Sequence, residues 1–148
     1  MSILLDTDVL SAFAKISGLE LLNELFSGEE ILITNGAQQA IELIFKLLGQ
    51  PGEYVAIESP TYANVIPLIR HHGLNILEIP VNDGGMNLTQ LEQNIAKKKP
   101  ILVYTIPNFQ NPTGITTDQS ASAVASCCSN RNICMTEAYH TASIINSH

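Results

Sequence analysis

The chain has 148 residues, of which 45% are hydrophobic, so it is long enough to form one globular domain with a buried core. Its 14 acidic residues against 7 basic ones give a net charge of -7, which repels phosphate backbones and argues against a nucleic-acid partner. No stretch reaches the roughly 18 apolar residues that a membrane-spanning helix needs, so we expect no membrane partner. We also expect a cytoplasmic location, because the N-terminus meets Asp6 and Asp8 early and lacks the basic region of a signal peptide.

Predicted helices and strands alternate along the first half of the chain. Residues 9–26 fit a helix only loosely, and the short apolar run at 31–34 suits a buried strand. From Ala37 to Leu48 the apolar side chains recur at i, i+3, i+4 and i+7, which is the spacing of one helix face. A second strand is expected at 54–57, followed by a helix at 63–71 that its proline should kink or shorten.

The second half of the chain continues this alternation. Asn87 is expected to cap a helix, because Asn is a good N-cap residue and Gln90 follows at the capping-box position. Strands that alternate with helices imply βαβ units, so we predict a single domain with three α/β/α layers and a mostly parallel sheet of about four or five strands. The other expected elements are a strand at 75–80, a turn at 83–85, a strand at 101–106, a helix at 120–129 and a strand at 133–136.

Loops rich in glycine, proline and amide side chains follow three of these strands. Open α/β sheets bind ligands beyond the carboxyl ends of their strands, so these loops are candidate binding elements. Asn, Pro, Thr and Gly also favour turns for local reasons, so an ordinary turn is the alternative reading of any one loop. The three loops read TNGAQQAI at 34–41, ESPTY at 58–62 and YTIPNFQNPTG at 104–114.

Taken in order, the three loops resemble the motifs of class I/II aminotransferases of fold type I, which use pyridoxal 5'-phosphate (PLP). The resemblance is greatest to the group that includes 2-aminoadipate aminotransferases and MocR-type regulators. It covers residues 28–118 well and 119–140 poorly, so it implies that residues 1–148 form a single, partial large domain. The cofactor-binding residues that it implies are Gly36, Ala37 and Gln38 for the phosphate, Tyr62 for stacking on the ring, and Asn111 and Tyr139 for the phenolic oxygen.

The sequence departs from this family at the residues that carry the chemistry. The family has an Asp three residues before the tyrosine equivalent to Tyr139, where it pairs with the pyridine nitrogen of PLP, but Thr136 stands there. The family also has a lysine beyond that tyrosine that bonds covalently to PLP, whereas no lysine follows Lys99. We therefore assign no catalytic residue and expect at most non-covalent binding of PLP.

The intact family transfers an amino group between an amino acid and a 2-oxo acid, so the resemblance implies these substrates. We expect the chain to be a fragment or truncated homologue that is inactive on its own. One alternative is the non-catalytic, ligand-sensing module of a MocR-type regulator, although residues 1–27 show no basic winged helix-turn-helix. An inert remnant is a second alternative, because Arg131 is the only charge between Asp118 and Glu137. A dinucleotide-binding enzyme is a third, although the sequence has no GxGxxG motif.

The remaining signals concern metals and assembly. Cys127, Cys128 and Cys134 lack paired metal-ligand spacing and the histidines form no HxxxH pair, so we assign no metal site and expect the cysteines to be small core residues. The resemblance implies that C-terminal elements of a complete large domain are missing from these 148 residues. Their absence should leave a sheet edge or apolar surface uncovered, so we expect a homodimer or other self-association.

Overall fold

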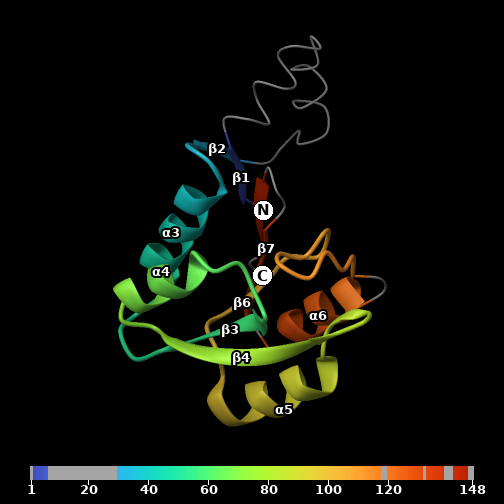
Figure 1. The fold of residues 1–148 in the computed structure, drawn as a ribbon. Coiled ribbons are helices and arrows are strands. Elements are labelled where there is room, and N and C mark those ends of the chain that lie inside the picture. The colour runs from blue at the N-terminus through green and yellow to red at the C-terminus, as the bar shows by residue number, and fades with distance from the viewer. Residues whose placement is uncertain (1, 7–29, 118–119, 132, 139–141, 147–148) are drawn as a thin grey trace.

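The fold is described from a computed structural model, which places residues 2–6, 30–117, 120–131, 133–138 and 142–146 (Figure 1). These residues form one sheet of eight strands in the order β2-β1-β8-β7-β6-β3-β4-β5. The strands are β1 (Ser2–Asp6), β2 (Glu30–Thr34), β3 (Tyr54–Ser59), β4 (Asn75–Asn82), β5 (Gly85–Met86), β6 (Leu102–Thr105), β7 (Cys134–Ala138) and β8 (Ala142–Asn146). The helices are α3 (Ala37–Leu48), α4 (Val65–His71), α5 (Leu88–Lys98) and α6 (Ser120–Ser129).

The strand directions place several loops at one edge of the sheet. β3 is parallel to both β4 and β6, β6 is parallel to β7, and β1 is parallel to β2. β8 is antiparallel to β7 on one side and to β1 on the other, where Ile3 pairs with Ile144. Because β8 runs opposite to both of its neighbours, β1 and β2 run in the same direction as β3, β6 and β7. The carboxyl ends of β2, β3 and β6, from which the three motif loops leave, therefore lie at the same edge.

The prediction of a three-layer α/β/α fold with a mostly parallel sheet is confirmed, but the predicted number of strands was wrong. β1 and β8 were not predicted, because they pair with each other from opposite ends of the described chain, where Ile3 lies beside Ile144. The turn predicted at 83–85 is shorter than expected, since Gly85 already belongs to β5 and pairs with Asn82. The helix predicted at 9–26 lies outside the described residues.

Local sequence signals explain the helix boundaries. α3 has the predicted limits, and Asn87 caps α5 as predicted, with its side-chain oxygen accepting from the Gln90 amide at 3.0 Å. The helix predicted at 63–71 begins at Val65 instead, which places Pro67 in the first turn of α4. The first-turn amides of a helix have no intrahelical acceptor, so a proline there neither kinks nor breaks the helix.

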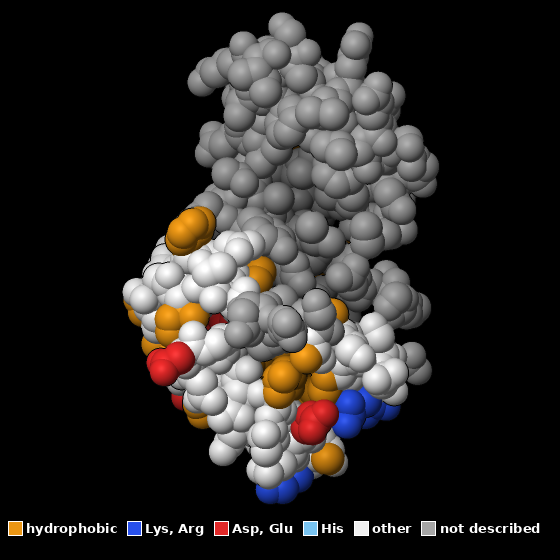
Figure 2. All heavy atoms as spheres, turned by 90° about the vertical axis from the view of Figure 1, so that its right-hand side faces the viewer, with side chains coloured by type: hydrophobic (Ala, Val, Ile, Leu, Met, Phe, Trp, Pro, Cys, Tyr) orange, Lys and Arg blue, Asp and Glu red, His pale blue; other side chains and the backbone are white. Residues whose placement is uncertain are grey.

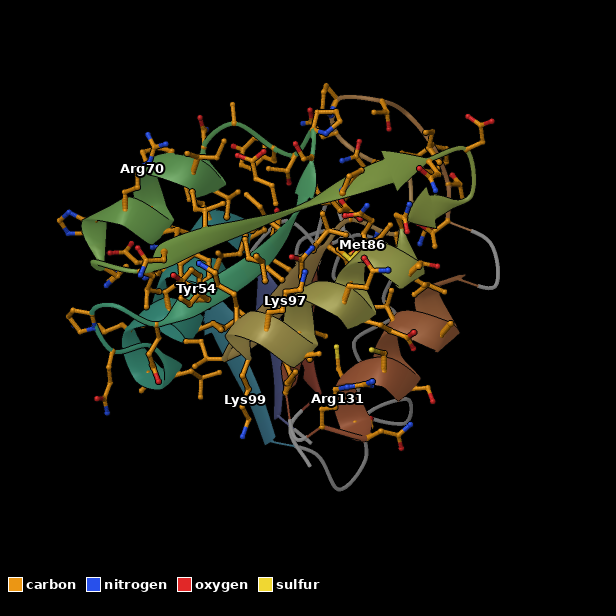
Figure 3. All side chains as sticks on the ribbon, turned by 90° about the horizontal axis from the view of Figure 1, so that it is seen from below. Tyr54, Arg70, Met86, Lys97, Lys99 and Arg131 are labelled. Carbon is orange, nitrogen blue, oxygen red and sulfur yellow. The ribbon has the colours of Figure 1, made fainter. Side chains whose placement is uncertain are left out.

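Helices cover both faces of the sheet, as Figures 1 and 3 show. The side chains of β3 alternate between these faces, with Val55 and Ile57 on one and Ala56 on the other. One hydrophobic cluster, the α3–α4 core, contains Ala40, Ile41, Ile44, Phe45, Val55, Ile57, Val65, Ile69, Leu74, Leu102, Tyr104 and Ile106. The other, the α5–α6 core, contains Ala56, Leu77, Ile79, Met86, Leu91, Ile95, Val103, Val124, Cys127, Cys128 and Ile133.

Cys127 and Cys128 are buried in the α5–α6 core, as predicted for small core residues. Burial raises the pKa of the Cys127 thiol, although the nearby Arg131 opposes this shift. The neutral thiol is therefore favoured at this position.

The surface of the described part is mixed in character. On the face drawn in Figure 2, the hydrophobic side chains lie in separate small groups among polar atoms. Among the described residues, the large hydrophobic side chains that are exposed are Ile33, Leu47, Leu48 and Phe109. No helix in this part of the chain is both long and apolar enough to cross a membrane.

Two residues of α3 test how much the α3–α4 core contributes to stability. Phe45 has no exposed surface, whereas Leu47 is 76% exposed. Phe45→Ala should lower the free energy of unfolding by about 3–5 kcal/mol, because it leaves a cavity in the core. Leu47→Ala on the same helix should change it by less than about 0.5 kcal/mol. Urea unfolding of both variants measures the difference, and equal losses would show that this core is not packed as described.

Candidate functional site

The first motif loop joins β2 to α3. Gly36 is the N-cap of α3, with φ 95° and ψ 161°, a conformation open in practice only to glycine. No side chain caps this helix end, so the amides of its first turn are not occupied in that way. Among the described residues, no atom lies within 4 Å of a Cβ added at Gly36, so this part of the chain leaves the space beside the turn open. An uncapped first turn beside open space suits an anion, because the amides and the helix dipole both favour negative charge.

Side chains hold this turn in shape. The Thr34 hydroxyl donates to the Gly36 carbonyl at 3.2 Å, and the Asn35 amide donates to the Gln39 side-chain oxygen at 2.6 Å. Ala37 and Gln38 form the first turn itself, where Ala37 is half-buried and Gln38 is exposed. The predicted phosphate-binding residues are therefore contiguous and partly accessible.

The second motif loop joins β3 to α4 and carries Tyr62. This side chain is half-buried and packs against the α3–α4 core, to which Ala40 of α3 also belongs. Its hydroxyl accepts a hydrogen bond from the Asn64 side-chain amide at 2.7 Å. The Tyr62 ring and the first half of α3 thus lie on the same side of the sheet.

The third motif loop follows β6 and folds back on itself. The Gln110 amide donates to the Ile115 carbonyl at 2.8 Å, and the Thr117 amide donates to the Pro107 carbonyl at 2.6 Å. Asn111 is exposed at the tip of this loop. Phe109 beside it is 67% exposed and has φ 50°, which is rare for a residue other than glycine.

A buried carboxylate joins the second and third loops. Glu58, only 1% exposed, lies at the carboxyl end of β3. Its Oε1 accepts from the Thr105 hydroxyl at 2.5 Å, and its Oε2 accepts from the Ile106 amide at 3.2 Å and from the Gln110 side-chain amide at 3.2 Å. Gln110 also donates to the Pro60 carbonyl at 2.7 Å. The loops that carry Tyr62 and Asn111 are therefore bonded to each other directly.

Burial dominates the electrostatics at this point. It raises the pKa of Glu58 above the usual carboxyl value, because hydrogen bonds from Thr105, Gln110 and Ile106 only partly offset the loss of solvent. Burial likewise raises the pKa of Tyr104, and the charge of Glu58 raises it further. Tyr104 therefore stays neutral, and its ring packs in the α3–α4 core.

The predicted site residues are only partly placed. Tyr62 and Asn111 lie on loops that are hydrogen-bonded together, and Gly36 lies at the same edge of the sheet, but whether all of them share one pocket stays a prediction. Tyr139 lies outside the described residues. Thr136 lies in β7 and pairs with Tyr104 in the register, so the strand that carries the expected acid position is where the sequence predicted it.

Sequence reasoning missed Glu58 and Gln110. A signal was present, because Glu58 directly follows the unbroken apolar run at 55–57 in a predicted strand of a mostly parallel sheet. Strands in such positions are buried on both faces, so a carboxylate there requires hydrogen-bond donors. Its partner could not be read from the sequence, since Gln110 is 52 residues away.

Comparison with known proteins identifies the family. The family described as Aminotransferase class I and II matches residues 6–134. The 2-aminoadipate transaminase of Thermus thermophilus is 41% identical over 86 residues, which make up 58% of this chain and 22% of that protein. The uncharacterized HTH-type transcriptional regulator YjiR of Escherichia coli is 29% identical over 113 residues, which make up 75% of this chain and 24% of the regulator.

A solved structure agrees with this assignment. LysN, the alpha-aminoadipate aminotransferase of Thermus thermophilus, was crystallised in complex with N-(5'-phosphopyridoxyl)-L-leucine. It is similar with a TM-score of 0.65 and 33% sequence identity, over 69% of this chain and 26% of that one. The chain thus spans about a quarter of the length of the curated relatives that it matches.

The buried carboxyl of Glu58 predicts a specific pH dependence of stability. The pKa of Glu58 is raised in the folded chain, so the folded state keeps a proton that the unfolded state releases near the ordinary value of 4.5. The contribution of Glu58 to stability is therefore complete below that value and is lost as pH rises through the raised pKa. Glu58→Gln should remove this part of the decline.

Urea unfolding between about pH 4 and about pH 8 measures this effect in both proteins. Glu42→Gln, on the exposed face of α3, is the matched control for loss of one carboxyl group. Identical profiles for the parent chain and Glu58→Gln would contradict a raised pKa at Glu58.

Proposed function

Because the chain belongs to the class I and II aminotransferase family, we propose that it forms the PLP-holding part of an aminotransferase site. The reaction served by such a site moves an amino group between an amino acid and a 2-oxo acid. The observation that carries this proposal is the bonding of the Tyr62 loop to the Asn111 loop at the sheet edge where the Gly36 turn also lies. A cytoplasmic location and self-association stay predictions.

The Gly36 turn fits the phosphate of PLP. The first-turn amides of Ala37 and Gln38 have no side-chain cap, and the space beside Gly36 is open. In this proposal the amides donate to the phosphate oxygens, and the helix dipole stabilises the dianion.

The other two loops fit the ring. Tyr62 offers a half-buried aromatic face held by its bond to Asn64, which suits stacking on the pyridine ring. Asn111 offers an exposed amide that can donate to the phenolic oxygen. When bound, PLP supplies a ring that withdraws electrons from the substrate. The role of Tyr62 and Asn111 is to bind and orient that ring.

The lysines of the described part lie away from this edge. α3 leaves the carboxyl end of β2 and ends next to the start of β3, so Lys46 in its last turn lies toward the opposite edge. Lys98 ends α5 and donates to the Tyr54 hydroxyl at 2.8 Å, at the first residue of β3. Figure 3 shows Tyr54, Lys97 and Lys99 in this region. We therefore propose that these 148 residues hold PLP without a covalent bond.

A second candidate function is ligand sensing without catalysis. The observation that favours it is the likeness to the regulator YjiR, which extends over 75% of this chain. A sensing module would use the same turn and loops to bind PLP or a related phosphate. Both functions require binding at this site, and neither requires turnover by these 148 residues.

Binding of PLP to the purified chain tests the proposal. We expect saturable binding and no single, stoichiometrically modified lysine after borohydride reduction, because no described lysine lies at the site. With an amino acid and 2-oxoglutarate, the chain should form no glutamate. One stoichiometric lysine adduct together with glutamate formation would overturn the non-covalent mode, and absence of any saturable binding would overturn the proposed function.

Gly36→Ala should weaken binding of PLP about tenfold or more, because alanine is strained at this φ and its methyl group enters the open space beside the turn. Gly52→Ala is a matched control, since Gly52 also has φ 95° and open space around it but lies in the turn before β3. Both variants should lose stability, and only Gly36→Ala should lose affinity. Isothermal titration with PLP measures the difference, and equal affinities would contradict the role of the Gly36 turn.

A further inference from the structure

The carboxamide of Gln110 uses its whole hydrogen-bonding capacity. Its Nε2 donates to the Glu58 Oε2 at 3.2 Å and to the Pro60 carbonyl at 2.7 Å. Its Oε1 accepts from the Thr113 amide at 3.0 Å and from the Thr113 hydroxyl at 2.6 Å. Gln110 is only 2% exposed, so water does not replace these partners. One side chain thus holds both the NPTG turn and the turn that precedes Tyr62.

The hydrogen bonds of Glu58 and Gln110 connect two loops as well as two strands. Thr105, the last residue of β6, and Ile106 next to it give the Glu58 carboxylate two of its hydrogen bonds. The third bond reaches into the adjacent loop, to the residue immediately before Asn111. The second Gln110 donor reaches Pro60, two residues before Tyr62.

We propose that Glu58 and Gln110 act as positioning residues that fix the Tyr62 loop and the Asn111 loop relative to each other. The pair touches neither the cofactor nor the substrate, and it acts through the two residues that do. This inference rests on the proposed function, because it assigns the pair a role in presenting the ring-binding face for PLP.

The donor directions make the pair testable with isosteric variants. Oε2 of Glu58 receives two obligatory N–H donors, whereas Oε1 faces a hydroxyl that can either donate or accept. Glu58→Gln can keep its oxygen toward Ile106 and Gln110 and donate its amide to Thr105, so it preserves the link. Gln110→Glu places an oxygen against both the Glu58 carboxylate and the Pro60 carbonyl, so it breaks the link without changing size.

Two probes separate positioning from general stability. PLP requires the phosphate turn and both loops, whereas inorganic phosphate requires the Gly36 turn alone. Gln110→Glu should weaken PLP binding about tenfold or more, by the cost of leaving buried acceptors unpaired, and change phosphate binding less than about twofold. Amide chemical shifts of Ala37 and Gln38 follow both titrations. Glu58→Gln should retain the affinity for PLP.

Three further variants serve as controls. Thr105→Val removes a donor to Glu58 but leaves the Glu58–Gln110–Pro60 link, so stability should fall while the ratio of PLP to phosphate affinity stays unchanged. Gln93→Glu adds the same charge on the exposed face of α5 and should change neither affinity. Gln110→Met removes the link without adding charge and replaces Gln110→Glu if that variant does not fold.

The outcomes are distinct. Loss of PLP affinity with retained phosphate affinity in Gln110→Glu or Gln110→Met supports positioning. Retention of both affinities in these variants, or equal loss of both, overturns the inference and leaves the proposed function standing. A parent chain that binds phosphate but not PLP overturns the proposed function, and the inference with it.

Discussion

Two neighbouring parallel strands, β3 and β6, end side by side, and one buried carboxylate joins the loops that leave them. Removing a carboxylate from water costs several kcal/mol unless donors replace the solvent. Glu58 obtains these donors from the end of β6 and from the loop beyond it. The Gln110 side chain also donates to the Pro60 carbonyl, so the loops that carry Tyr62 and Asn111 are held together at this point.

The two hydrophobic cores supply the frame for this contact. β3 contributes alternate side chains to the α3–α4 core and the α5–α6 core, so the strand cannot shift by one residue without exchanging them. That register fixes the position of Glu58 along β3, so that its carboxylate lies beside Thr105. The α3–α4 core also contains Ala40 and packs against Tyr62, so the same apolar contacts that stabilise the sheet hold α3 and the Tyr62 loop on one side.

Features decided by near neighbours were readable from the sequence. The limits of α3 follow from a local periodicity, and the cap of α5 follows from Asn87 and its amide partner three residues later. Features decided by distant pairing were not. The pairing of β8 with β1 and the link from Glu58 to Gln110 depend on residues far apart in the chain, and nothing in either local sequence identifies the partner. The three motif loops were found because their residues are contiguous, while Tyr139 lies outside the described residues.

The pairing of Ile3 with Ile144 has a consequence for the order of folding. β1 leaves the ribosome long before β8, and loop closure over so many residues is slow. Until β8 arrives, the β1–β2 pair and the block formed by β7, β6, β3 and β4 have no strand between them. During this time β1 and β7 each have one edge without a strand partner, and such edges can pair with strands of other chains. Chaperone binding to the nascent chain should therefore last until residues 142–146 have emerged.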